Sequence, residues 1–308
     1  MKKKVLLGMS GGIDSSVAAF LLKEQGYNII GAYMNYWNDT SHIPENELHN
    51  YPENKCCSTE SLFSARQIAA KLDFPLYTLN YQDNFKEHIV DRFLDKHKKG
   101  LTPNPCVSCN VFIKFGAFFE KMKELGCDYL ATGHYARVNK NNNLEHQLYA
   151  GIDDKKDQSY FLYHLNKEQL PHILFPLGEI TKKQTRTLAE KYELSELLHK
   201  KESQGVCFYP ESSYSPFLQR YIPEIFKHGE VVYHGEAIGT HTGLPRYTIG
   251  QRRGIDIGGF TEPIYVIKLD YENNALIMGD DIELYKDKLS AKDFTLTGEQ
   301  PETKNFIE

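Results

Sequence analysis

The sequence has no long apolar run, no excess of basic residues and few cysteines. No segment of the 308 residues approaches the roughly 18 uninterrupted apolar positions of a membrane-spanning helix, and the basic start leads into glycines rather than a signal-peptide core. The net charge of −5 gives no general attraction to nucleic acid, so any such binding must be local. We therefore expect a cytoplasmic globular protein without membrane contact, and at roughly 150 residues per domain the length favours about two domains.

Only six cysteines are present, at positions 56, 57, 106, 109, 127 and 207. In a cytosolic protein they favour thiol chemistry or metal binding over a structural disulfide framework. Cys106 and Cys109 form a Cys-x-x-Cys pair, but no second such pair exists, which disfavours a closed four-ligand zinc site. The pair leaves three interpretations: a redox couple, half of a metal site, or one working thiol with a chance neighbour. Cys56 and Cys57 are expected where a loop enters a helix, and Cys127 in buried packing.

The first half of the chain alternates between strand-like apolar runs and helical patterns. The expected strands cover residues 4–9, 28–37, 75–81 and 128–136, and the expected helices follow the first strand and cover residues 61–72, about 84–99 and 111–125. Because alternating strands and helices form parallel sheets covered on both faces, this pattern predicts a doubly wound α/β domain. Its ligand is expected at the carboxyl ends of the strands.

The second half of the chain has a different sequence pattern. Residues 166–200 are expected to be helical, residues 201–225 irregular and polar, and the chain from about 229 onward is expected to form small antiparallel hairpins, because glycines separate its short β-rich runs. The last residues, AKDFTLTGEQPETKNFIE, are expected to begin a further, truncated β unit. We predict three parts: 1–165, a helical and irregular part 166–225 that carries Cys207, and a smaller β-rich part 226–308.

The stretch VLLGMSGGIDSSVAAFLL near the N-terminus combines a strand, a glycine turn and a helix. The unpaired N–H groups of a helix that begins after Gly12 attract an anion, and glycine lets the backbone approach a phosphate closely. Ser10, Ser15 and Ser16 add hydroxyl donors, and Asp14 is a candidate Mg²⁺ ligand. A Walker A loop would supply a lysine for a γ-phosphate, and this turn has none. It therefore favours an enzyme that binds pyrophosphate and transfers AMP. The alternative is a turn between a strand and a helix that binds no ligand.

The motif SGGIDSS resembles the signature of the N-type ATP pyrophosphatases, a group that includes NAD and GMP synthetases and several tRNA-thiolating enzymes. The segment GLTPNPCVSCNVFIKF narrows the choice, because two prolines present Asn104 and Cys106 in a defined geometry before a helix expected to start near Asn110. Cys109 is expected at the start of that helix, whose dipole would lower the thiol pKa from about 8.5. A third thiol, Cys207 in KESQGVCFYP, follows a glycine and is expected on a mobile loop.

Eight blocks together resemble the tRNA-specific 2-thiouridylase family (MnmA/TrmU) along nearly the whole chain. They occur in the family's order: GMSGGIDSSVAA, CCSTESLFSARQIAAKL, TPNPCVSCNVFIKF, ATGHYAR, KKDQSYFLY, FPLGEITKKQTRTLAEK, KESQGVCF and YTIGQRRG. Chance similarity over eight ordered blocks is negligible. The alternative to weigh is therefore a paralogue with altered activity.

The resemblance implies an ATP site, a tRNA site and two working cysteines. The residues that match the family's ATP contacts are Gly8, Met9, Ser10, Gly11, Gly12, Ile13, Asp14, Ser15, Met34 and Gly133. The residues that match its tRNA contacts are Asn104, Pro105, Cys106, His134, Lys156, Asp157 and Gln158. Cys109 matches the catalytic nucleophile, and Cys207 matches the cysteine that carries a persulfide.

The family makes 2-thiouridine at the wobble position of tRNAs for lysine, glutamate and glutamine. The resemblance therefore implies ATP and Mg²⁺ as cofactors and adenylation of the uracil C2 oxygen, which turns a poor leaving group into a good one. Persulfide sulfur on Cys207 would arrive by direct attack or as sulfide freed by Cys109, leaving a Cys109–Cys207 disulfide that a reductant resets. A cysteine desulfurase or a sulfur relay protein would charge Cys207.

Two departures from the family pattern matter. Many members have aspartate where this chain has Cys106, and a thiol cannot do the same acid/base work at the same pH. Cys106, Cys109 and Cys207 would also furnish three thiolates for a [4Fe-4S] cluster with one open iron, which we keep as an alternative.

The second departure is at the C-terminal end. The family usually continues into a full C-terminal β-barrel, of which this sequence contains only about the first strand, so the tRNA contacts made there are unassigned.

Two other functions compete with thiolation. One is a shortened paralogue that binds tRNA or ATP without thiolating, and the other is a different adenylating ligase of the same fold, which would have no use for the two cysteine motifs. Basic residues add a local nucleic-acid hypothesis. Lys182, Lys183 and Arg186 are expected either to contact tRNA phosphates or to form a solvated face, and Arg252 and Arg253 to contact tRNA or anchor a hairpin.

Overall fold

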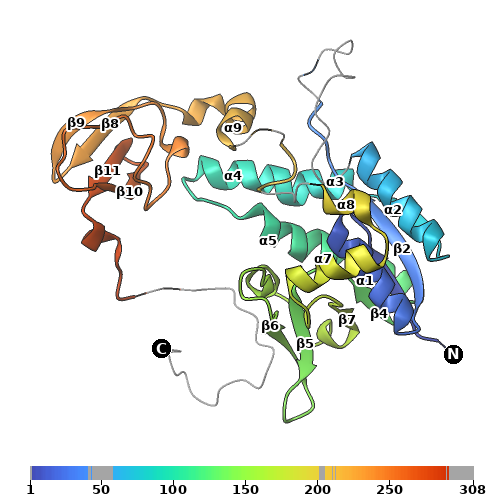
Figure 1. Ribbon diagram of the computed structural model, residues 1–308. Coiled ribbons are helices and arrows are strands. Elements are labelled where there is room, and N and C mark those ends of the chain that lie inside the picture. The colour runs from blue at the N-terminus through green and yellow to red at the C-terminus, as the bar shows by residue number, and fades with distance from the viewer. Residues whose placement is uncertain are drawn as a thin grey trace. The chain divides into compact units, whose positions relative to one another are not determined.

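The computed structural model describes residues 2–40, 43, 58–200, 205–209, 211, 213–288 and 290. Contacts divide the chain into two compact units, each described by itself below: the first holds residues 1–89 and 105–210, and the second holds residues 90–104 and 211–292. Figure 1 shows the elements of both units. Cys56 and Cys57, and the expected strand after residue 290, lie outside the described residues. Our three-part division of the chain stays a prediction.

A five-stranded parallel sheet forms the centre of the first unit, in the order β3-β2-β1-β4-β7. Its strands are β1 (Lys4–Gly8), β2 (Asn28–Asn35), β3 (Leu76–Asn80), β4 (Tyr129–Ala131) and β7 (Ile173–Leu174). Val5 and Leu7 of β1 join the core cluster with Val17 of α1, whereas Leu6 is equally buried but lies outside that cluster. Since alternate residues of a strand face opposite sides, both faces of the sheet are covered, as expected of a doubly wound α/β domain.

The helices of the first unit follow the strands in alternation. They are α1 (Ile13–Glu24), α2 (Thr59–Lys71), α3 (Gln82–Phe85), α5 (Pro105–Cys109), the π-helix η3 (Asn110–Ala117), α6 (Phe118–Glu124), α7 (Lys182–Lys191) and α8 (Ser195–Leu198). The π-helix η2 (Lys86–Asp91) crosses into the second unit. A hairpin of β5 (Ala136–Lys140) and β6 (His146–Ala150) and the 3₁₀ turns η4 (Ser159–Leu162) and η5 (Leu170–His172) complete it. Packing dominates stability here, since each fully buried Val or Leu contributes about 1.5–3 kcal/mol.

The second unit is built on a four-stranded sheet in the order β10-β11-β8-β9. Its strands are β8 (Gly229–Tyr233), β9 (Glu236–His241), β10 (Tyr265–Asp270) and β11 (Ala275–Gly279), and its helical elements are α4 (Arg92–Lys98), α9 (Ser215–Tyr221), η6 (Pro223–Ile225), η7 (Leu244–Arg246) and η8 (Asp281–Leu284). The β8–β9 and β10–β11 pairs are antiparallel, which confirms the hairpins expected from the glycine spacing. No described helix of either unit is long and apolar enough to cross a membrane.

Three expectations about secondary structure are wrong. The helix expected near Asn110 begins at Pro105, because proline is favoured at the first helical position, where its missing N–H costs nothing. The helical stretch expected over 166–200 is helical only in α7, α8 and a short 3₁₀ turn, and it contains strand β7. The irregular stretch expected over 201–225 contains α9. Short elements such as these carry too little periodicity to be recognised in a sequence.

Gly178→Ala tests the close packing between β5 and the turn before α7. A Cβ atom at residue 178 would lie 1.9 Å from the Ala136 carbonyl oxygen, so backbone would have to move. We expect the free energy of unfolding, measured by denaturant titration, to fall by about 3 kcal/mol. Gly26→Ala is the control, because Gly26 has a φ of +85° but no atom within 4 Å of the added Cβ, and it should lose only about 1 kcal/mol. Equal losses in the two variants would contradict the packing argument.

Candidate active site

The glycine turn between β1 and α1 is held in a conformation that only glycine adopts easily. Gly11 has a φ of +71°, and a Cβ atom there would lie 2.0 Å from the Ser61 carbonyl oxygen of α2. Gly12 caps α1 without any side-chain hydrogen bond, so no side chain of this cap occupies the first N–H groups of the helix. The turn therefore presents backbone donors at the carboxyl end of the central strand, where an anion is expected.

The three serines of the turn have different roles. The Ser15 hydroxyl lies 3.1 Å from the Gly12 carbonyl and accepts a 3.2 Å hydrogen bond from the Ser10 backbone N–H. The Ser16 hydroxyl donates to the same Gly12 carbonyl at 2.9 Å, and Ser16 is fully buried. Ser16 therefore closes the first turn of α1 and does not face a ligand, contrary to our expectation. The Ser10 side chain is exposed at the turn.

Asp14 is joined to a lysine that lies 168 residues later in the chain. The Lys182 ammonium lies 2.7 and 2.9 Å from the two carboxylate oxygens of Asp14, and the Tyr135 hydroxyl lies 2.8 Å from the first of them. Lys182 is only 8% exposed. The expectation of a solvated face is therefore wrong for Lys182, because its charge is directed inward beside the glycine turn, and the expected contact with tRNA phosphates stays a prediction.

The first turn of α7 explains how Lys182 reaches this position. Thr181 caps the helix, accepts from the Gln184 N–H and is bonded in return by the Gln184 side chain, so both ends of a capping box are present. The Lys182 backbone N–H also donates to Asp153 at 2.8 Å. These contacts fix the direction in which α7 starts. Thr185, one turn away, adds a side-chain oxygen 2.9 Å from the Tyr135 hydroxyl.

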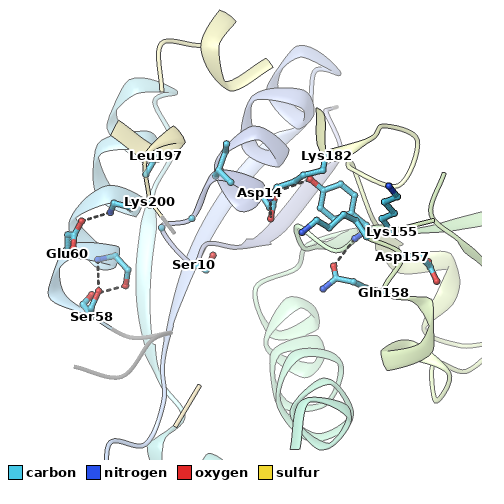
Figure 2. A pocket seen from close by; sticks show the side chains of 16 residues that line it. Ser10, Asp14, Ser58, Glu60, Lys155, Asp157, Gln158, Lys182, Leu197 and Lys200 are labelled. Carbon is cyan, nitrogen blue, oxygen red and sulfur yellow. Dashed lines mark hydrogen bonds and ion pairs between the residues drawn. The ribbon is translucent and has the colours of Figure 1, made fainter. Parts of the chain in front are cut away.

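A cavity of about 570 Å³ opens over the glycine turn, and Figure 2 shows the side chains that line it. Its lining includes four lysines, Lys155, Lys156, Lys182 and Lys200, against the acidic Asp14, Glu60 and Asp157. Lys200 lies 2.8 Å from Glu60 and 3.0 Å from the Ser64 hydroxyl, so it comes to the cavity from the side of α2. Four cations around exposed backbone donors suit a polyphosphate.

A second, smaller cavity of about 240 Å³ shares Ser10, Asp14 and Gln158 with the first. Its other lining residues are Gly8, Met9, Ser15, Met34, Tyr36, Lys114, Thr132, Gly133 and His134. A Cβ atom at Gly133 would lie 3.0 Å from the Ser15 backbone nitrogen, so a larger residue would crowd the start of α1. Met34 and Gly133 thus lie together beside the glycine turn, as their expected nucleotide contacts require, and the contacts themselves stay predictions.

His134 is buried in the wall of the second cavity. Its Nδ1 atom lies 2.6 Å from the Thr132 hydroxyl, and its Nε2 atom lies 3.5 Å from the Lys114 ammonium. Burial, and secondly the charge of Lys114, lowers the pKa of His134 well below its usual value, so the ring is neutral at physiological pH. The tRNA contact that the resemblance implied for His134 stays a prediction, although its ring is only 7% exposed.

The segment Lys156 to Gln158 lines the larger cavity rather than a separate surface. The Asp157 carboxylate accepts from the Gly151 N–H at 2.8 Å and from the Ser159 hydroxyl at 2.7 Å, and Gln158 accepts from the Tyr135 N–H at 3.0 Å. These bonds hold the segment against the cavity. Its expected tRNA contacts stay predictions, and no local sequence pattern indicated that it lies beside the glycine turn.

The Cys-x-x-Cys pair occupies α5 rather than the loop before a helix. Cys106 is the second residue of α5 and is exposed, whereas Cys109 is its last residue and is 8% exposed. The helix continues from Cys109 into η3, so the positive end of the dipole lies nearer Cys106. The expectation that Cys109 sits at a helix start is therefore wrong. Asn104 is exposed and directly precedes Pro105.

Cys207 is half-buried, and its neighbour Phe208 anchors it to the first unit. The Phe208 ring packs edge-on against Phe85 at 5.9 Å, and Phe85 in turn packs against Tyr36 at 4.9 Å. Tyr36 lines the smaller cavity. The segment that carries the expected persulfide is therefore connected by two aromatic contacts to the wall of that cavity.

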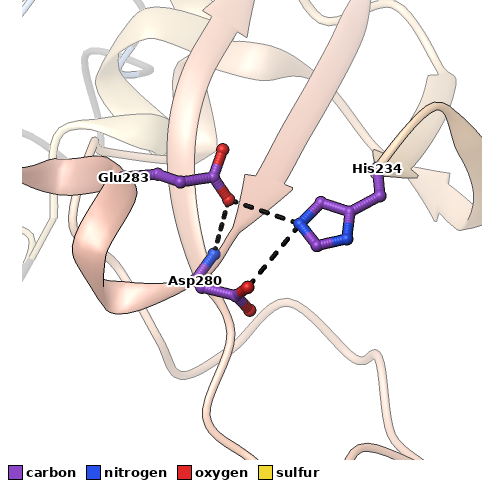
Figure 3. Close-up of side chains that lie close together, drawn as sticks. All are labelled: His234, Asp280 and Glu283. Carbon is purple, nitrogen blue, oxygen red and sulfur yellow. Dashed lines mark hydrogen bonds and ion pairs between the residues drawn. The ribbon is translucent and has the colours of Figure 1, made fainter.

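The three sulfurs do not form a metal site in the part of the chain that the structure describes. There, one group of three or more His, Cys, Asp or Glu side chains has its ligand atoms within 4.8 Å of one another, namely His234, Asp280 and Glu283 of the second unit (Figure 3). These side chains are surface ion pairs of 3.4 and 3.6 Å around a capping box at the start of η8. The structure therefore lends no support to an iron–sulfur cluster at Cys106, Cys109 and Cys207.

Comparison with known proteins agrees with the site. A model of the tRNA methyl transferase HUP domain matches residues 3–211, and a model of the tRNA methyl transferase PRC-barrel domain matches residues 215–280. The tRNA-specific 2-thiouridylase MnmA of Natranaerobius thermophilus is 44% identical over 96% of this chain and 80% of its own, and that of Symbiobacterium thermophilum is 45% identical over 94% and 74%.

Solved structures are more distant. A 4-thiouridine synthetase in complex with RNA and ATP is 14% identical, with a TM-score of 0.40 over 72% of this chain and 51% of that one, which is too distant to carry a functional argument. The family models and the curated relatives suffice without it, because the first model alone matches more than half of the 308 residues. The chain belongs to the tRNA-specific 2-thiouridylase family, MnmA.

Proposed function

We propose that this protein uses ATP to convert a uridine of tRNA into 2-thiouridine, at the wobble position of the tRNAs for lysine, glutamate and glutamine. The observation that carries the proposal is a pair of cavities that share three lining residues. One has four lysines around a phosphate-type turn, and the other is lined in part by the helix that continues from Cys109. The names of the 44–45% identical relatives support the same reaction.

The larger cavity is suited to hold pyrophosphate as it leaves. Backbone donors of the glycine turn and the ammonium groups of its lysines would bind the β- and γ-phosphates, and the smaller cavity with Met34 and Gly133 would take the adenosine. The lysine that a Walker A loop carries within the turn comes here from α7, as Lys182. Attack by the uracil C2 oxygen on the α-phosphorus then gives an adenylated base and free pyrophosphate.

Asp14 fits Mg²⁺ only in part. Its carboxylate is a suitable hard ligand, but both of its oxygens already bind the Lys182 ammonium. Mg²⁺ bound with ATP would bring charge neutralisation to the phosphates, and Asp14 would hold it once Lys182 turns toward those phosphates. Lys182 and the other lysines of the cavity remain the protein's own contribution to phosphate binding.

Sulfur transfer requires a nucleophile in place of water. The terminal sulfur of a Cys207 persulfide would attack C2 of the adenylated uracil, and AMP would leave with the C2 oxygen. Cys109 would attack the other persulfide sulfur and form a disulfide with Cys207, which a reductant must then open. A cysteine desulfurase or a sulfur relay protein would recharge Cys207. The aromatic contacts of Phe208 support a position of Cys207 on the side of the smaller cavity.

Both matching domain families are named after a tRNA methyl transferase, so methyl transfer is the second candidate function. The usual methyl donor is a sulfonium cation without phosphates, so the four lysines around the glycine turn would have no phosphate to bind. Methyl transfer would also leave Cys207 without a role. Binding of tRNA or ATP without chemistry is the third candidate, and it predicts no pyrophosphate release.

Replacing Cys109 or Cys207 with serine should separate the two half-reactions. Each variant should release pyrophosphate from ATP in the presence of unmodified tRNA at a rate near that of the parent protein, because no sulfur takes part in adenylation. Each should lose thiolation by at least 100-fold, seen as absent retardation of the tRNA on a mercury-containing gel. Cys127→Ser is the matched control and should thiolate normally. Loss of nucleotide binding in the Cys109 or Cys207 variant would mean that these cysteines are structural.

Lys182→Met should weaken nucleotide binding. A charge-assisted hydrogen bond contributes about 1.5–3 kcal/mol, so the KM for ATP in tRNA-dependent pyrophosphate release should rise about 10–100-fold. Lys183→Met is the control, because Lys183 is the next residue on α7 and is exposed. An unchanged KM in the Lys182 variant would remove this lysine from the phosphate site.

A further inference from the structure

The five lysines around the two cavities are divided four to one. Lys155, Lys156, Lys182 and Lys200 line only the larger cavity, and Lys114 lines only the smaller one. Ser10, Asp14 and Gln158 line both, so they mark the junction. If the larger cavity takes the leaving pyrophosphate and the smaller one takes adenosine, the α-phosphate lies at this junction. Lys114 is then the cation on the adenosine side of the reacting phosphorus.

Helix geometry relates Lys114 to Cys109. Helix α5 continues through Cys109, whose backbone is helical (φ −61°, ψ −42°), into the π-helix η3, in which the Phe118 N–H bonds the Ile113 carbonyl five residues earlier. In such a helix the hydrogen bonds join residues five apart, so these residues lie about one turn apart. Lys114 follows Cys109 by five positions. A Cβ atom at Gly116 would lie 2.7 Å from the Val111 carbonyl oxygen, so the wide turn also depends on a glycine.

The Lys114 ammonium is held by a histidine whose tautomer the contacts define. An ammonium has no lone pair, so a hydrogen bond with His134 Nε2, 3.5 Å away, requires that nitrogen to accept and to lack a proton. In that tautomer the ring proton is on Nδ1, which lies 2.6 Å from the Thr132 hydroxyl. The Phe115 and Phe175 rings pack against the histidine with ring centroids 5.9 and 6.0 Å away, and His134 is only 7% exposed. A neutral, immobilised imidazole thus directs the lysine into the cavity.

We propose that Lys114 is a catalytic residue of the adenylation step and that His134 is its positioning residue. This inference rests on the proposed function. The ammonium contacts a non-bridging oxygen of the α-phosphate while the uracil C2 oxygen attacks. One bond forms between that oxygen and the α-phosphorus, and the bond to the bridging oxygen breaks, with its electron pair leaving on pyrophosphate. Lys114 keeps its proton throughout and stabilises the negative charge that grows on the phosphoryl oxygens.

The test compares Lys114→Met with the parent protein in rapid-quench measurements of tRNA-dependent pyrophosphate release. Removal of one such charge-stabilising donor lowers kcat by about 100–1000-fold, and we expect this loss with the KM values for ATP and tRNA changed less than threefold. Lys114→Arg should recover at least tenfold over methionine, because the charge is retained. The control is Lys121→Met on α6, which should behave as the parent protein because Lys121 is half-buried, is paired with Glu124 and lines neither cavity.

His134→Leu provides the second arm. A positioning role predicts a smaller loss of kcat than in Lys114→Met. It also predicts no additional loss in the double variant, because without Lys114 the side chain at residue 134 has nothing left to position. Additive losses in the double variant would overturn the positioning role. Thermal unfolding and ATP binding test whether each variant is folded. If His134→Leu does not fold, the comparison of Lys114→Met with Lys114→Arg tests the catalytic role of Lys114 by itself.

Three outcomes distinguish a failure of this inference from a failure of the proposed function on which it rests. A kcat within threefold of the parent in Lys114→Met overturns the catalytic role. A raised KM for tRNA with an unchanged kcat also overturns it, because it makes Lys114 an anchor for the tRNA backbone. A parent protein that releases no pyrophosphate with any of the three tRNAs overturns the proposed function itself, before the variants are compared.

Discussion

The contact between Asp14 and Lys182 holds the active site together. It joins the glycine turn at the start of the chain to a helix 168 residues later, and it brings a cation to a turn that has none of its own. Ion pairs that are partly withdrawn from water add little net stability, because desolvation offsets their attraction. The main effect of the pair is to fix a position: the Asp14 carboxylate holds the Lys182 ammonium beside the glycine turn.

This arrangement also resolves the apparent conflict between the acidic chain and its anionic substrates. The net charge of −5 describes the whole surface, whereas four lysines converge on one cavity. Fields inside a cleft depend on the charges that line it and on its low-dielectric walls, much more than on distant surface charges. A binding site for ATP and tRNA phosphates is therefore compatible with an acidic protein.

Local patterns were enough to predict the parts of the fold that depend on neighbouring residues. The strand, turn and helix around SGGIDSS and the hairpins of the second unit follow from short-range periodicity and glycine placement. Lys114 and Tyr135 were missed as site residues, and Lys182 was considered only as a tRNA phosphate contact or a solvated lysine, because their positions depend on contacts across 20 to 168 residues. The capping pattern Thr181 to Gln184 is the one local sign that a helix begins with Lys182. Pro105 was misjudged, since we treated it as a loop stiffener although proline favours the first turn of a helix.

The burial of Cys109 changes how its reactivity must be explained. It lies at the end of α5, within a continuous helix, so the dipole that would stabilise a thiolate acts on the exposed Cys106 instead. If Cys109 is the nucleophile that we propose, its activation requires another source of positive charge, and Lys114, five positions later in the same continuous helix, is a candidate. A disulfide with Cys207 also requires the two sulfurs to approach to about 2 Å. The Phe208 ring packs against Phe85 on one side of Cys207, whereas Gly205, two residues earlier, has a φ of +82° and no atom within 4 Å of the place that a Cβ would take.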